Sequence, residues 1–180
     1  MEEKSFKNRL LRIFSLLLAV GVLILALKIL NWVPLALDKD IIRRYASIEE
    51  VQGSLKIADL HIPSYFPQTI RWPPSEILAQ GKPFPGLMME FRDIEKGEAT
   101  LIITQAKAPH FNPDSRIGIE EVKEKVGYDL KGRKALLEVG SCPGGGPCSI
   151  ISWAEGDYTI HVFLKAPPIE LIRIAESMLR

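Results

Sequence analysis

The chain has 180 residues, of which 47% are hydrophobic and 25% charged, and its formal net charge at pH 7 is +1. Lys and Arg do not gather into a basic stripe, so we expect no nucleic-acid partner, because phosphate binding relies on such a patch. The length beyond the N-terminal segment suits one domain with its own core.

The N-terminal flank is basic, and the chain then runs apolar from Ile13 past Lys28 to Val33. As a helix, residues 13–33 would reach about 31 Å, enough to cross a hydrocarbon core of about 30 Å. Lys28 can extend its ammonium group to the headgroups, and Trp32 suits the same interface. We therefore predict a single transmembrane helix at 13–33 that anchors the chain in the lipid bilayer.

A cleaved signal peptide is the alternative for this segment. Small residues are missing from one of the two positions that precede each candidate cut. For a cut after Ala26, Ile24 stands two residues before that alanine, and for a cut after Ala36, Pro34 does. The pattern favours an uncleaved anchor.

Basic residues before the apolar run set the expected orientation, because the first positive flank usually stays in the cytoplasm. We predict a cytoplasmic N-terminus at 1–12, a juxtamembrane linker at 34–46 and an extracytoplasmic domain at 47–180. That domain would be periplasmic or cell-surface.

Period-two apolar alternation is the main structural signal beyond the linker. Short turns join most of the alternating segments, which is typical of antiparallel pairing. Ser47 and Glu50 have capping-box spacing and predict a helix at 47–55, and the apolar stripe of 168–179 predicts a C-terminal helix. The fold class is α+β, an antiparallel sheet of about five strands with the C-terminal helix packed on it. The predicted strands are 87–92, 100–107, 134–139, 149–154 and 158–164.

The segment SIISWAEGDYTIHVFLKAPPIELIRIAESML, residues 149–179, resembles the closing segment of a bacterial extracytoplasmic domain family of unknown function. That family is found on membrane-anchored, anti-sigma-like or sporulation-associated proteins. IPSYFPQTIRW, residues 62–72, looks like the family's opening, although Ser64-Tyr65-Phe66-Pro67 replaces its glycine-containing form. The resemblance covers roughly residues 60–180 and implies a membrane-tethered sensing or binding domain, with no catalytic residue and no cofactor.

Cys142 and Cys148 bracket the sequence PGGGP between two predicted strands. A disulfide needs Cα atoms about 4.4–6.8 Å apart, and facing positions of an antiparallel pair offer about 4.5–5.5 Å. We predict a structural disulfide, which would contribute about 2.4 kcal/mol by restricting the unfolded chain. A redox pair, half of a zinc site, a phosphate loop and free thiols remain as alternatives. A zinc site would need further ligands from His61, His110 or His161, so we predict no metal site.

Residues 62–86 combine prolines with aromatic side chains. The stretch is interpreted either as a rigid flap that covers an end of the sheet or as a preordered aromatic surface for a partner. Aromatic residues and Arg most often anchor interfaces, which singles out Tyr65, Phe66, Arg71 and Trp72. The partner would be an envelope protein, a peptide or a glycan.

No arrangement of side chains in the sequence is typical of catalysis, so we expect a binding or sensing domain and not an enzyme. The alternatives are an envelope thiol redox protein or enzyme that uses Cys142 and Cys148, and a structural component of an envelope assembly.

Overall fold

The computed structural model describes residues 18–28, 42–55, 60–108, 111, 113 and 118–179. The chain forms two compact units, Met1–Ile41 and Ile42–Arg180. In the first unit, residues 18–28 are helical, and their large apolar side chains are exposed. None of the helices in the described ranges is both long and apolar enough to span a membrane. Residues 1–12, 13–17 and 29–33 lie outside the described residues, so the span at 13–33 stays a prediction.

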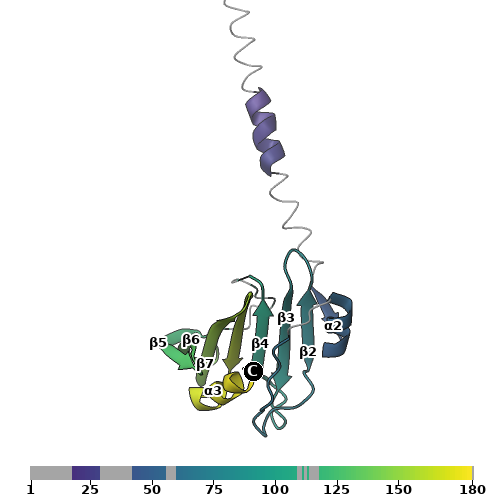
Figure 1. Ribbon diagram of the computed structural model, residues 1–180. Coiled ribbons are helices and arrows are strands. Elements are labelled where there is room, and N and C mark those ends of the chain that lie inside the picture. Colours follow the sequence, from purple (N-terminus) through teal and green to yellow (C-terminus); the bar gives the residue numbers. More distant parts are fainter. Residues whose placement is uncertain are drawn as a thin grey trace, which may run out of the picture. The chain divides into compact units, whose positions relative to one another are not determined.

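The second unit is built on one antiparallel sheet of eight strands, in the order β1-β2-β3-β4-β8-β7-β6-β5 (Figure 1). The elements are β1 (Arg43–Tyr45), α2 (Ile48–Leu55), β2 (Glu76–Gln80), β3 (Gly86–Arg92), β4 (Ala99–Ala106), β5 (Glu121–Leu130), β6 (Arg133–Ser141), β7 (Pro147–Glu155), β8 (Tyr158–Leu164) and α3 (Pro168–Ser177). The predicted α+β class, the antiparallel sheet and the C-terminal helix packed on it are therefore confirmed.

The predicted number of about five strands is wrong, because β1, β2 and β5 also belong to the sheet. β1 has only three residues, too few for alternation to show in the sequence. β2 follows directly after a proline-rich segment, and because prolines are typical of loops, no strand was predicted there. β5 is the edge strand and is exposed along almost its whole length, so its sequence shows no apolar alternation.

Alternating side chains give the sheet two buried faces. Leu87, Met89 and Phe91 of β3 point to the larger core, which α3 covers. Met88 points to the opposite face, where it packs in a smaller core with Ile102 and Phe163. We call these the first and the second face of the sheet. β3 and β4 are buried on both faces, which makes them the centre of the domain.

The two helices begin as their sequences predict. Ser47 Oγ accepts a hydrogen bond from the Glu50 backbone N–H at 3.2 Å, and the Glu50 carboxylate accepts one from Ala46 N–H at 2.8 Å. α3 begins at Pro168, whose missing N–H is no loss in a first turn. The side of α3 that faces the sheet is buried: Leu171, Ile174 and Ala175, together with Met178 at the C-cap.

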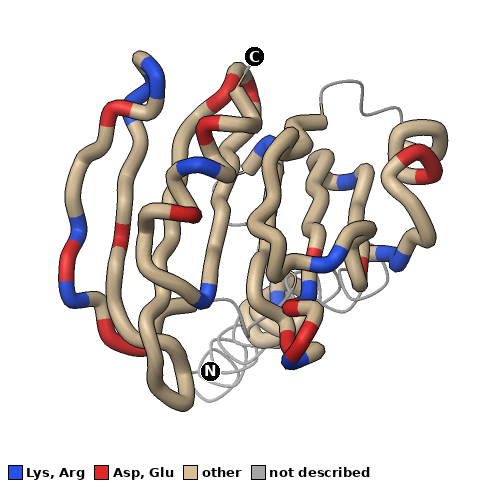
Figure 2. The backbone as a smooth tube through the Cα atoms, turned by 90° about the horizontal axis from the view of Figure 1, so that it is seen from below, with Lys and Arg blue, Asp and Glu red and all other residues tan. Residues whose placement is uncertain are grey.

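Charged residues are spread over the domain. Figure 2 shows Lys/Arg and Asp/Glu interspersed along the described backbone. On β5, acidic and basic residues alternate at the edge of the sheet, a pattern that discourages pairing with another strand.

Gly140 of β6 is a position where the fold requires glycine. A Cβ there would collide with the backbone carbonyl of Glu121 on the neighbouring β5. We predict that Gly140→Ala lowers the free energy of unfolding by about 1–3 kcal/mol, because the two strands would have to move apart. Urea denaturation of the purified chain measures this loss.

Gly127→Ala is the matched control, since a Cβ at this position of the same hairpin meets nothing within 4 Å. Equal stability of the two variants would contradict the close approach at Gly140.

Candidate functional site

Trp72 lies at the end of the sheet where β3 finishes. Its ring stacks on Phe91 with centroids 6.0 Å apart, and Phe66 lies 5.3 Å from Trp72 and 5.1 Å from Phe91. Trp72 is nevertheless 53% exposed. The structure therefore brings the rings of Phe66 and Trp72 together on a floor that the core residue Phe91 provides.

The backbone around Trp72 is fixed to the sheet. Arg71 N–H donates to the carbonyl of Arg92 at 2.9 Å, and Ser75 N–H donates to the carbonyl of Glu90 at 2.8 Å. Residues 71–75, which precede β2 in the chain, thus run beside β3 and extend the pairing that β2 makes with it. The side chain of Arg71 is exposed next to Trp72 in the chain.

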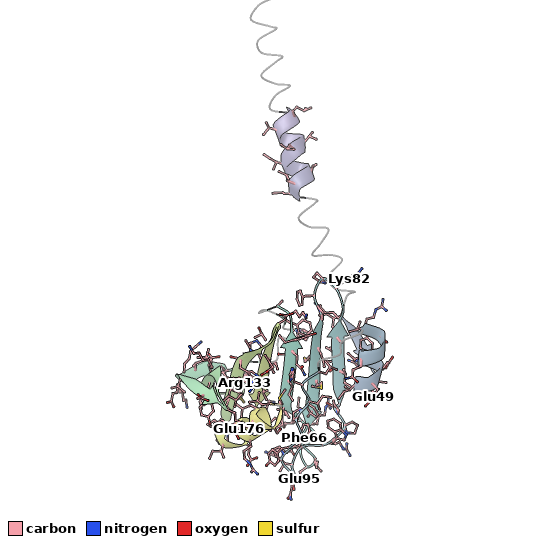
Figure 3. The ribbon with its side chains drawn as sticks, in the orientation of Figure 1. Glu49, Phe66, Lys82, Glu95, Arg133 and Glu176 are labelled. Carbon is pink, nitrogen blue, oxygen red and sulfur yellow. A yellow bond between two sulfur atoms is a disulfide. The ribbon has the colours of Figure 1, made fainter. Side chains whose placement is uncertain are left out.

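Ile94 adds a second exposed apolar side chain at this end, at 56%. Its N–H donates to the carbonyl of Thr69 at 2.8 Å, which ties the β3–β4 turn to the segment before Trp72. We call Phe66, Arg71, Trp72 and Ile94 the aromatic surface. Figure 3 shows Phe66 and Glu95 at one end of the sheet and Lys82 at the other.

Tyr65 has a different role from its predicted companions. Its hydroxyl donates to Glu170 of α3 at 2.7 Å, and the Arg173 guanidinium lies 4.3 Å from its ring centre. Its backbone N–H donates to Ser177 Oγ at 3.2 Å. Tyr65 therefore joins the loop to α3 and lies outside the aromatic surface.

The Tyr65–Glu170 hydrogen bond shifts both pKa values. The Tyr65 hydroxyl, and then Arg173, hold the pKa of Glu170 below its usual value, because both favour the carboxylate. The same hydrogen bond raises the pKa of Tyr65, since the hydroxyl must stay protonated to donate.

Cys142 and Cys148 form a disulfide with Cα atoms 5.2 Å apart. Cys148 pairs with Gly140 in the sheet, and Cys142 lies just past the end of β6, so the two cysteines are diagonal and not directly opposed. Both residues are buried in the smaller core of the second face, at 4% and 0% exposure.

The three glycines of the disulfide loop all need a left-handed backbone. Gly144, Gly145 and Gly146 have φ values of 85°, 92° and 87°, which residues with a Cβ rarely adopt. The backbone bonds Gly145 N–H to Cys142 O, at 2.9 Å, and Cys142 N–H to Gly146 O, at 3.0 Å, close the loop. The glycine run is thus explained by the turn itself.

A polar pocket of about 390 Å³ lies at the β7–β8 turn. The buried side chain of Gln105 holds the His61 backbone beside it, accepting from N–H at 2.9 Å and donating to the carbonyl at 2.6 Å. Arg133 forms a forked ion pair with Glu155 and holds the pKa of that carboxyl below its usual range. The pocket is lined by Leu60, His61, Lys107, Glu155, Gly156, Asp157 and Tyr158.

Within the described ranges, no group of three His, Cys, Asp or Glu is arranged to hold a metal ion. His110 lies outside these ranges. His161 lies on β8 opposite Thr104 and Ser152, on the second face, while its neighbours Ile160 and Val162 point into the larger core.

Comparison of the chain with protein-family models, with curated proteins and with solved structures found no match. Sequence reasoning missed Ile94 and the polar pocket. Ile94 follows Asp93 in a turn, where no periodicity marks it, and the pocket joins residues from distant parts of the chain. The exposed aromatic surface is the feature from which a function can be argued.

The Tyr65–Glu170 contact predicts a pH-dependent effect on stability. Because the pKa of Glu170 is lowered from 4.5, its contribution is present above pH 4.5 and is lost as the pH falls through the lowered value. We expect Tyr65→Phe to lower the free energy of unfolding at pH 7 and to have a smaller effect at pH 3. Urea denaturation at the two pH values measures both effects.

Tyr128→Phe, on the edge strand β5, is the matched control and should show no such pH dependence. A loss of stability from Tyr65→Phe that is the same at both pH values would count against the carboxylate as the acceptor.

Proposed function

We propose that the protein is a single-pass, membrane-anchored extracytoplasmic domain that binds or senses a partner through its aromatic surface, without enzymatic activity. The observation that carries this proposal is Trp72, which remains 53% exposed although Phe66 and Phe91 hold its ring in place. An exposed but immobilised Trp loses little conformational entropy when a partner covers it.

The composition of the aromatic surface indicates the kind of partner. Trp and Arg are the side chains most enriched among residues that dominate binding energy. Trp72, Arg71 and Ile94 combine an aromatic face, a cation and an aliphatic side chain. Such a set suits an envelope protein, a peptide or a glycan.

The N-terminal segment supports a membrane anchor. Apolar side chains are exposed around the helix at 18–28, and the apolar run continues on both sides of it in the sequence. The chain enters the sheet at Arg43, which pairs with Ala79 near the Lys82 turn, so the aromatic surface lies at the other end of the domain. The resemblance of residues 149–179 to a domain family of membrane-anchored extracytoplasmic proteins agrees with this location.

The disulfide supports an oxidising compartment and a structural role for the cysteines. Both cysteines are buried, whereas reactive cysteines are partly exposed in electropositive surroundings. This favours a structural staple over the alternative of a thiol redox protein.

Thiol labelling in intact cells tests the location. We expect Cys142 and Cys148 to react with a maleimide only after reduction, and then also with a membrane-impermeant maleimide, because the domain lies outside the membrane and its cysteines are paired. Acid-quenched samples followed by mass shift on gels give the measurement. Thiols that react without reduction, and only with a permeant reagent, would place the domain in the cytoplasm and overturn the proposal.

Trp72→Ala tests the aromatic surface. We expect a loss of stability of only about 1 kcal/mol, because half of the ring is exposed, together with loss of partner binding. A photoreactive residue at position 94 should form an adduct in intact cells that disappears in the Trp72→Ala background.

Ile169→Ala is the matched control, since Ile169 is another exposed apolar residue, on α3. The adduct should persist in that background. If Trp72→Ala unfolds the domain, Trp72 acts as part of a covering flap, and an unchanged adduct would show that the surface does not bind.

A further inference from the structure

β5 leaves a long edge of the sheet open. Within the described residues it has a neighbour on one side only, β6, and it ends the strand order there (Figure 1). Its side chains are exposed along almost its whole length. The opposite edge strand, β1, has three residues, whereas β5 has ten. β5 is therefore the edge along which a further strand has room to pair.

The β5–β6 hairpin determines which residues of β5 turn their backbone to this open edge. Leu130 and Arg133 flank a two-residue turn, so they bond to each other through both N–H and C=O. Bonded and non-bonded pairs then alternate along the two strands. Every second residue before Leu130 thus bonds to β6, and the residues between them point their N–H and C=O groups to the open edge. These outward residues are Lys125, Gly127 and Asp129.

The outward residues are a cation, a glycine and an acid, a pattern that is complementary to itself when reversed. In an antiparallel pair with Gly127 opposite Gly127, Lys125 of each copy stands opposite Asp129 of the other. Lys125 keeps its own ion pair with Glu138 on β6, at 2.5 Å, and Asp129 keeps Lys134 opposite it on β6. Charges of opposite sign therefore alternate across four strands, from β6 of one copy to β6 of the other.

The same pattern selects this register among its neighbours. In antiparallel registers that bring outward residues together, the residue opposite Lys125 is Lys125, Gly127, Asp129 or Lys131. Only the third of these provides an acid. On the first face, the same register sets Val126 of each copy, which is 37% exposed, opposite Tyr128 of the other. A β-branched residue opposite an aromatic one is a favourable cross-strand pair.

We propose that β5 pairs with β5 of a second copy of the chain, antiparallel about a two-fold axis at Gly127, so that the two sheets join into one. The charges that discourage pairing of β5 with other strands are matched by this one partner. A two-fold contact is the commonest way in which identical chains associate. The inference does not rest on the membrane anchor or on the aromatic surface, because no residue of that surface lies on β5.

A cysteine at position 127 tests the proposal in the membranes of cells that make the full-length chain. Opposed residues whose backbones bond to each other have Cα atoms about 5.5 Å apart, within the range of about 4.4–6.8 Å for a disulfide. We therefore expect Gly127→Cys to give a linked dimer on a non-reducing gel after mild oxidation, and the dimer should disappear on reduction.

Lys125→Cys is the matched control, because position 125 is also exposed on the same strand. In the proposed register its two copies lie about 13 Å apart along the strands, too far for a disulfide. We expect at least about tenfold less linked dimer than with Gly127→Cys. Absence of a linked dimer with Gly127→Cys, or an equal amount with Lys125→Cys, would overturn the proposal.

Light scattering after size-exclusion chromatography of the full-length chain in detergent gives a second test. Gly127→Pro removes an outward N–H that the β5–β6 hairpin does not use, so we expect this variant to stay folded and become monomeric. Gly127→Ala keeps the N–H, and its Cβ meets nothing within 4 Å in the chain, so it should stay dimeric like the wild type.

A wild-type chain that is monomeric at about 0.1 mM would overturn the proposal, because such weak pairing would leave β5 to another protein or to solvent. A folded Gly127→Pro chain that remains dimeric would overturn it as well. The cysteine test decides the matter by itself if Gly127→Pro is unstable.

Discussion

The structure depends on the need to cover both faces of β3 and β4. These strands are apolar on both sides, so each face must be shielded by other parts of the chain. On the first face, α3 and the segment that contains Leu60, Ile62 and Tyr65 provide the cover. On the second face, neither α2 nor α3 supplies residues to the smaller core, and the disulfide loop contributes Cys142 and Cys148 to it. The disulfide therefore forms part of the cover of the second face.

This requirement explains which parts of the fold were predictable. The five predicted strands are apolar along one face or along both faces, and the stripe of α3 was readable because one side of the helix is buried. β5 escaped prediction because its side chains are exposed on both faces, so nothing forces a period on its sequence. The Leu130-Lys131-Gly132-Arg133 turn was the available signal, since Lys131 and Gly132 both have positive φ in a two-residue hairpin connection.

The residues of the candidate sites and the buried carboxylate Glu90 also differ in whether the sequence alone could predict them. Trp72 and Arg71 stood out in the sequence because a proline-rich segment with aromatics is unusual by composition alone. Tyr65 looked equivalent to them, yet its hydroxyl reaches Glu170, far along the chain, and no local pattern reveals that bond. Glu90 could not be singled out at all. It alternates with Leu87, Met89 and Phe91 like any polar residue on an open face, and its burial comes from Ser75 and other residues distant in the sequence.

The end of the sheet at which β3 finishes holds both Trp72 of the aromatic surface and the buried Glu90. One stretch of backbone explains why they lie together. Residues 71–75 run beside β3, bonded at Arg92 and at Glu90, and place Trp72 over Phe91 on the first face and Ser75 against Glu90 on the second. Prolines at 73 and 74 lack N–H groups, so the bonds that fix this stretch fall at its two ends. Trp72 is therefore the residue of this stretch that lies over the first face, and Ser75 is the one that lies against the second face. The exposed ring of Trp72 and the buried carboxylate of Glu90 therefore lie close together because this one stretch runs beside the end of β3.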